Sequence, residues 1–278
     1  MKKLLITALV GLSSVALSLS SANAQSTITS VPGDVILGFY ATSGSGSGVD
    51  LEVDLGSVTK FINATPGTVF NLSGSTGLAV ADLVSTYGAN WATDPNLFWG
   101  TAASNQTTQV DSLPNYSLFA TDPETTPGTL STPWQAGNRF QQQPASGLIA
   151  SLYTGLNQST STANSSVSNV LPTSQGDSYF NQDVTSGGGG ISFEYFQPSS
   201  DNNVTNTNAS GNSISDFYEL LQTNAGNNGQ LLGKFELNSN GTFEFVAVPE
   251  PSTMGLTGVG FLSLIGLVAL RRRRSILA

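Results

Sequence analysis

The chain has 278 residues and a formal net charge of −9, with neither cysteine nor histidine. These two absences exclude disulfides, thiol chemistry, Ser-His-Asp triads and histidine zinc sites. Between residues 25 and 248 three basic residues face seventeen acidic ones, so this part carries 3 − 17 = −14. Because such a surface repels phosphate backbones, we expect no nucleic-acid partner; divalent cations or neutral glycans suit it better.

The N-terminal segment has the three parts of a secretory signal peptide. Two lysines precede an apolar run at 4–19, and Ala22 and Ala24 form an A-x-A cleavage site. We therefore expect residues 1–24 to be removed during export through the Sec machinery.

Two apolar runs at 35–41 and 49–56 flank the flexible stretch SGSGSG and predict a β-hairpin with a long loop. The second run alternates apolar and acidic residues, which places its carboxylates on one face of the strand. These acidic residues are Asp50, Glu52 and Asp54.

This acidic row has three interpretations. Alternation produces a solvated strand face by default, and the sequence favours that interpretation. Neighbouring carboxylates in the row lie about 6–7 Å apart, and Ca²⁺ accepts several such oxygens, so a calcium site is the second interpretation. The third is catalysis, because the spacing loosely resembles the carboxylate pair of glycosidases.

Three segments show the apolar spacing of amphipathic helices. The first segment, 78–88, ends on Gly88, a favourable C-cap residue. The second segment is 146–156. The third follows Ser213, a suitable N-cap, and reads SISDFYELL. We interpret each apolar stripe as core packing.

Further strands are predicted at 96–102, 116–122 and 191–197. Two stretches, 157–176 and 198–212, are rich in Ser, Asn and Thr and predict mobile loops.

The aromatic residues offer one candidate ligand contact. Trp134 lies in TPWQAGNRF and is the best candidate for an exposed platform that stacks on sugar rings, with core packing as the alternative. Trp91 and Trp99 are expected in the core. Arg139, the one arginine between 25 and 248, is expected to pair with a carboxylate.

The segment 231–248 predicts a hairpin whose register the apolar pattern selects. A two-residue turn would set Leu237 opposite Glu244, whereas a three-residue loop at 239–241 sets Leu237 opposite Phe243. The glycine of that loop supplies the left-handed residue. Together these elements predict a mainly β fold, an antiparallel β-sandwich or partial barrel with a few short helices, in a single domain at 25–248.

The C-terminal segment 249–278 has its own organisation. Pro249, Glu250 and Pro251 form an extended junction, because proline fixes φ and lacks an N–H. Residues 254–270 carry no charge and would form a transmembrane helix about 25 Å long, just short of the ~30 Å hydrocarbon core. A basic stop follows, which keeps this end cytoplasmic and the body outside. It consists of Arg271, Arg272, Arg273 and Arg274.

The proline motif, the short apolar span and the arginine cluster, in this order, resemble the PEP-CTERM sorting signal of Gram-negative bacteria. The resemblance covers residues 248–274 and implies recognition by exosortase, a membrane-embedded cysteine transpeptidase. It also implies cleavage near the motif and delivery from the inner membrane to the cell surface or extracellular matrix. The runs at 87–92 and 96–102 are similar to ectodomains of other PEP-CTERM proteins, which have no assigned activity.

Two functions from different classes follow. The first is a structural protein of the envelope or of an exopolysaccharide or biofilm matrix. The second is a secreted carbohydrate- or calcium-binding module. We expect no enzymatic activity and no cofactor other than Ca²⁺.

Overall fold

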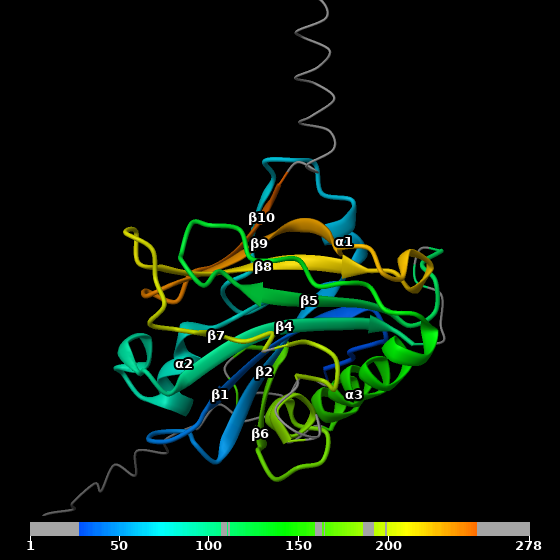
Figure 1. Ribbon diagram of the computed structural model, residues 1–278. Helices are drawn as coiled ribbons and strands as arrows, with labels where there is room; N and C mark the ends of the chain where they lie inside the picture. The colour runs from blue at the N-terminus through cyan, green and yellow to red at the C-terminus, as the bar shows by residue number, and fades with distance from the viewer. Residues whose placement is uncertain are drawn as a thin grey trace, which may run out of the picture.

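One antiparallel sheet contains the ten strands in the part of the chain that the computed structural model describes (Figure 1). That part comprises residues 28–106, 110, 112–158, 163, 165–185, 192–197 and 199–248. The strand order is β3-β10-β9-β8-β5-β4-β1-β2-β6, and β7 pairs with β4 outside this path.

The strands are β1 (Asp34–Ala41), β2 (Val49–Ser57), β3 (Val69–Asn71), β4 (Leu97–Asn105), β5 (Ser117–Pro123), β6 (Ser168–Pro172), β7 (Asn202–Asn203), β8 (Asn212–Leu220), β9 (Gln230–Asn238) and β10 (Phe243–Ala247). The helices are α1 (Thr59–Ile62), α2 (Val80–Tyr87) and α3 (Arg139–Asn157), with single turns η1 (Trp91–Thr93), η2 (Asn181–Thr185) and η3 (Gln222–Asn224).

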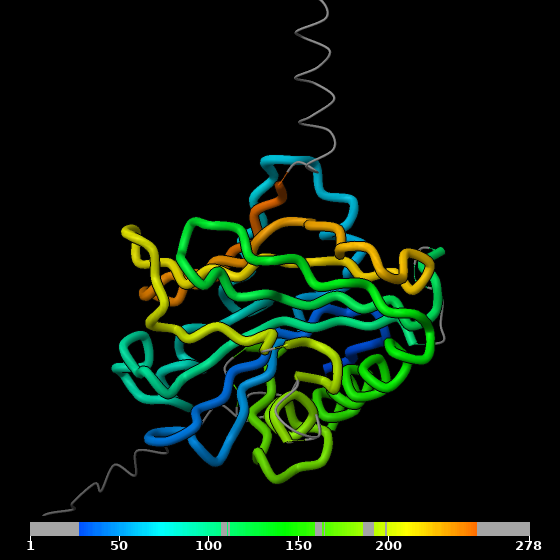
Figure 2. The backbone as a smooth tube through the Cα atoms, viewed as in Figure 1, coloured from blue at the N-terminus to red at the C-terminus, as the bar shows by residue number. Residues whose placement is uncertain are grey.

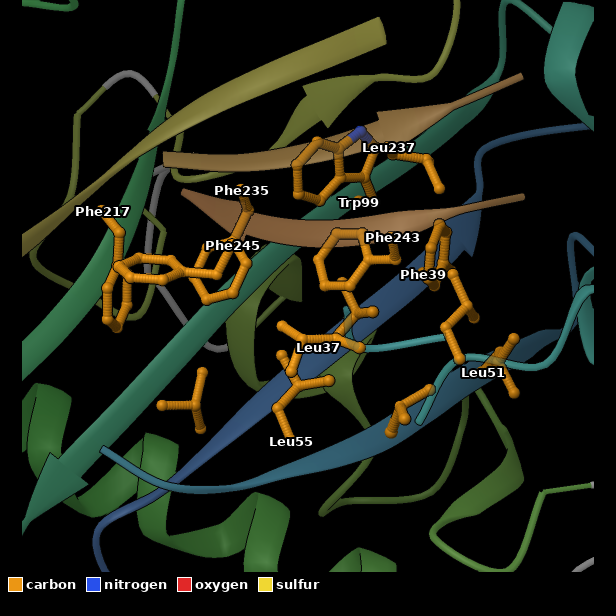
Figure 3. Packing of buried hydrophobic residues seen from close by; sticks show 14 of the residues in the cluster. Leu37, Phe39, Leu51, Leu55, Trp99, Phe217, Phe235, Leu237, Phe243 and Phe245 are labelled. Carbon is orange, nitrogen blue, oxygen red and sulfur yellow. The ribbon is translucent and has the colours of Figure 1, made fainter. Parts of the chain in front are cut away.

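The sheet curls into a half-barrel around an aromatic core. Trp99 of β4 and Phe243 of β10 belong to strands that β5, β8 and β9 separate, yet their ring centroids lie 5.6 Å apart, edge to face. Figure 3 shows the phenylalanines of β8, β9 and β10 facing Leu37 and Phe39 of β1 across this core. Phe61 of α1 lies among them, with its ring 4.9 Å from that of Phe245. Each such buried ring contributes roughly 1.5–3 kcal/mol.

The opposite face of the sheet has a second core beneath α3. Side chains along β1 alternate between the cores, so Leu37 and Phe39 face the first while Ile36 and Tyr40 face the second. Helix α3 buries its apolar stripe there, and the segment that contains η2 lies beside it on the same face (Figure 2). Asn138 starts α3 with a capping box to Gln141.

Most of the predicted elements are confirmed. Strands β1 and β2 form the predicted hairpin, and β4 and β5 match the runs at 96–102 and 116–122. Helix α2 ends at Gly88 as predicted, and α3 includes 146–156 but begins seven residues earlier at its capping box. In the last hairpin Leu237 pairs with Phe243, so the three-residue loop is confirmed.

Two predicted elements are wrong. The helix after Ser213 is strand β8, which lies between β5 and β9 and is buried on both faces. Its buried polar residues hide the alternation that would identify a strand. The strand at 191–197 is a turn closed by a Ser192–Phe196 bridge, with Phe193 and Glu194 at positive φ.

The predicted mobile loops contain short strands. The stretch 157–176 includes β6, which pairs with β2, and the stretch 198–212 includes β7. The fold is therefore mainly β and antiparallel, with one curled sheet instead of the two sheets of a sandwich.

The signal peptide at 1–24 and the tail at 249–278 lie outside the residues that the structure describes. Among the helices that are described, we find none with the length and apolar character needed to cross a bilayer.

Candidate functional site

The acidic row of β2 is buried beneath the segment that leads into η2. Asp50 and Glu52 are each 0% exposed. The backbone N–H of Phe180 donates to Asp50 Oδ2 at 2.7 Å, and that of Tyr179 donates to Glu52 Oε1 at 2.6 Å. These two hydrogen bonds hold the overlying segment on the sheet. The predicted solvated strand face is wrong at both positions.

Asp54, the third member of the row, has a different environment. It is half-buried, and its Oδ1 accepts a hydrogen bond of 2.7 Å from the backbone N–H of Gly56. The described residues contain no group of three or more acidic, histidine or cysteine side chains arranged to hold a metal ion. One oxygen of each carboxylate accepts a hydrogen bond from its own backbone donor, and the calcium site at Asp50, Glu52 and Asp54 stays a prediction.

Two paired glycines make room for a tyrosine beside this row. Gly38 of β1 pairs with Glu52 on one side and with Gly100 of β4 on the other. A Cβ at Gly38 would overlap the ring of Tyr179, so only glycine lets this ring lie against the sheet. The Tyr179 hydroxyl then reaches Asp201 Oδ1 at 2.7 Å.

A second acidic pair lies at the hydroxyl end of the Tyr179 side chain. Asp183 of η2 and Asp201, just before β7, lie near each other, because Ser192 and Ser200 connect Asp183 to the residue that precedes Asp201. Ser192 Oγ donates to Asp183 Oδ1 and lies 2.8 Å from Ser200 Oγ. Residues 179–185, 192 and 199–201 thus bring two carboxyl groups and three hydroxyl groups together over the sheet. We call Tyr179, Asp183, Ser192, Ser200 and Asp201 the oxygen cluster.

Sequence reasoning missed the oxygen cluster. Ser192 lies in a predicted strand, Ser200 and Asp201 lie in a predicted loop, and no element was predicted at Tyr179 or Asp183. Its floor is formed by strands far away in the sequence. The signal that identifies it is the pair of mid-strand glycines, Gly38 and Gly100, because glycine inside a strand marks a close approach of another group.

Burial shifts the ionisation of these acids upward. It raises the pKa of Asp50 to about 7 and that of Asp54 to about 6. For Glu52 the pKa lies well above its usual range, because burial is complete and Asp50 is nearby. The pKa of Asp183 is raised strongly by burial and then by the Asp201 charge.

The basic residues of the body interact elsewhere. Lys60 Nζ lies 5.0 Å from the centroid of the Phe70 ring, and Lys234 forms an ion pair of 2.7 Å with Glu236. The Arg139 guanidinium lies 5.1 Å from the centroid of the Tyr116 ring, so its predicted carboxylate pairing is replaced by a cation–π contact. No interaction with a basic side chain is among the causes of the raised pKa values of Asp50, Glu52 and Asp183.

Trp134 is not an exposed platform. It is 9% exposed, its Nε1–H donates to Thr121 O at 3.3 Å, and its ring packs 5.4 Å from that of Phe196. The predicted core positions of Trp91 and Trp99 are confirmed.

Two shallow hollows flank the first turns of α3. One, of about 330 Å³, is lined by the edge of Trp134 together with Tyr195 and several glutamines. The other, of about 550 Å³, is lined by Gln106, Tyr116, Phe140, Gln143, Pro144 and Gly147. Phe140 is 84% exposed, so an open aromatic ring does exist on this surface, at a position that the sequence did not single out.

Comparison with known proteins identifies the C-terminal segment. Residues 247–274 match the family described as the PEP-CTERM protein-sorting motif. The chain is therefore a PEP-CTERM sorting domain-containing protein. No curated protein and no solved structure matches the chain. The motif implies an exported, membrane-anchored precursor that exosortase processes for the cell surface, and it covers roughly a tenth of the chain.

The raised pKa values predict stability that falls as pH rises. A carboxyl group whose pKa is higher in the folded chain binds more protons when folded, so its stabilising effect is complete below the unfolded value of about 4. That effect is lost as pH rises through the folded values of about 6 and 7 for Asp54 and Asp50. We expect the thermal midpoint of unfolding, measured by circular dichroism in EDTA, to be lower at pH 8 than at pH 5.

The variant Asp50→Asn provides the control, because an amide oxygen still accepts the Phe180 N–H but does not titrate. Its midpoint should depend less on pH than that of the wild type. A wild-type midpoint that rises from pH 5 to pH 8 would contradict the prediction.

Proposed function

We propose that the exported domain is a non-catalytic structural component of the cell envelope or of an exopolysaccharide or biofilm matrix. In this proposal, Sec exports the chain, the C-terminal segment holds it in the inner membrane, and exosortase then releases it near Pro249, Glu250 and Pro251. The sorting motif at 247–274 supports the delivery route.

The burial of Asp50 and Glu52 is the observation that favours a structural role. A glycosidase pair must reach its substrate and water, and its two carboxyl groups act as proton donor and as base or nucleophile. Here each of these carboxylates accepts a backbone N–H and is closed off from solvent. Their hydrogen bonds attach the segment at Tyr179 and Phe180 to strand β2.

A carbohydrate-binding role is the second candidate, and the surface beside α3 favours it. Phe140 offers an exposed ring, and the amides of Gln106 and Gln143 line the same hollow. Aromatic rings with neighbouring amides suit a neutral, hydroxyl-rich chain, whereas the −14 charge of the body disfavours an anionic polymer.

The delivery route predicts that the proline motif is required for processing. Replacing Pro249, Glu250 and Pro251 together with alanine should leave an unprocessed precursor in the inner-membrane fraction, because the extended junction is lost. Mass spectrometry of the C-terminus provides the measurement, and Phe140→Ala, far from the motif in sequence, should be processed like the wild type. If the mature wild-type protein still ends at Ala278, the proposed processing is wrong.

The carbohydrate candidate predicts weaker glycan binding without the exposed ring. Phe140→Ala should reduce affinity for a neutral polysaccharide by about threefold to tenfold, the range that one aromatic contact provides. Affinity electrophoresis measures this, with Val69→Ala, an exposed change on β3, as the control. A wild-type chain that binds no neutral polysaccharide would remove this candidate.

A further inference from the structure

The oxygen cluster contains an electrostatic conflict. Asp183 is 1% exposed and Asp201 is 7% exposed, and the charge of Asp201 acts on Asp183, which Ser192 and Ser200 connect to the residue before Asp201. Two neighbouring like charges that are both buried away from water repel each other strongly. The body has three basic residues, Lys60, Arg139 and Lys234, and each interacts elsewhere. A positive charge that is not a side chain must therefore balance the pair when both acids are ionised.

One carboxylate oxygen of the pair lacks a hydrogen-bond donor. Asp201 Oδ1 accepts the Tyr179 hydroxyl, but Asp201 Oδ2 has no hydrogen-bond partner among the described residues. This oxygen belongs to a side chain that is more than nine-tenths buried and whose charge raises the pKa of Asp183. A buried acceptor of this kind costs free energy unless a ligand satisfies it.

The surroundings supply further oxygens and space. Ser192 Oγ and Ser200 Oγ lie 2.8 Å apart beside Asp183, and Tyr40 also lies close to Asp201. On the sheet side, a Cβ at Gly100 would overlap both Asp201 Oδ1 and the Tyr179 hydroxyl. The glycine thus leaves room where the acidic pair meets β4.

We propose that Asp183 and Asp201, together with the hydroxyl groups of Ser192 and Ser200, bind one calcium ion. All of these donors are oxygens, as Ca²⁺ requires, and its flexible coordination of six to eight ligands also accepts water and backbone carbonyls. Mg²⁺ fits less well because it demands regular octahedral geometry at shorter distances. The ion joins η2 to the chain just before β7, so it holds residues 181–185 and 199–201 together on the sheet.

Calcium should stabilise the full-length chain at neutral pH. At pH 7.5, adding CaCl₂ to protein in EDTA-free buffer, at a hundredfold excess over Kd, should raise the thermal midpoint by about 5–10 °C. Isothermal titration with CaCl₂ should give one ion per chain, and MgCl₂ at the same concentration should give a smaller shift. No calcium shift in the wild type, with no binding heat, would overturn the proposal in favour of a proton shared by the pair.

Two variants test the location of the ion. Asp201→Asn removes one charge of the pair, so the calcium shift should disappear while the midpoint in EDTA is kept or raised. Asp122→Asn is the matched control, because Asp122 is also a buried acid and pairs across strands with Asp216. That variant should keep the full shift. An unchanged shift in Asp201→Asn, or a lost one in Asp122→Asn, would place the ion elsewhere.

If Asp201→Asn does not fold, Asp183→Asn replaces it in the same comparison. Wild-type titration needs no variant, so a stoichiometry of zero overturns the site in either case.

Discussion

The burial of carboxyl groups without basic partners is the constraint on which the outer face of this structure depends. Asp50 and Glu52 leave water, and backbone N–H groups of Phe180 and Tyr179 replace part of their hydration. Desolvation of a carboxylate is costly, so the acids favour their neutral forms or require a cation. The stability of the segment that covers this part of the sheet therefore depends on pH and on the cations present.

The two faces of the sheet are packed by different kinds of contact. The inner face is closed by aromatic rings, and Phe61 of α1 packs within a cluster that joins distant strands. The outer face is covered partly by α3 and partly by an irregular segment whose position depends on polar contacts. Specificity for one arrangement of that segment comes from the glycine pair Gly38 and Gly100 and from the carboxylates that they adjoin.

What the sequence predicts correctly is local. The pairing of Leu237 with Phe243 follows from alternation over a few residues, and the end of α2 follows from Gly88. Strand β8 was missed because both of its faces are buried, which removes the period that identifies a strand. The acidic row was interpreted as solvated because the donors that cover it lie 127 and 130 residues away in the chain. No pattern of neighbouring residues predicts such a long-range contact. A glycine inside a strand, however, indicates that another group approaches the strand closely at that position.

Hydrogen exchange at two backbone amides tests the central claim most directly. The N–H groups of Tyr179 and Phe180 donate to Glu52 and Asp50, so at pH 5 their protection factors should approach those of the sheet. In EDTA, protection at both amides should fall by pH 8, while amides of β1 stay protected. Amides at 179 and 180 that exchange at pH 5 as fast as those of the exposed loop 42–48 would contradict the account.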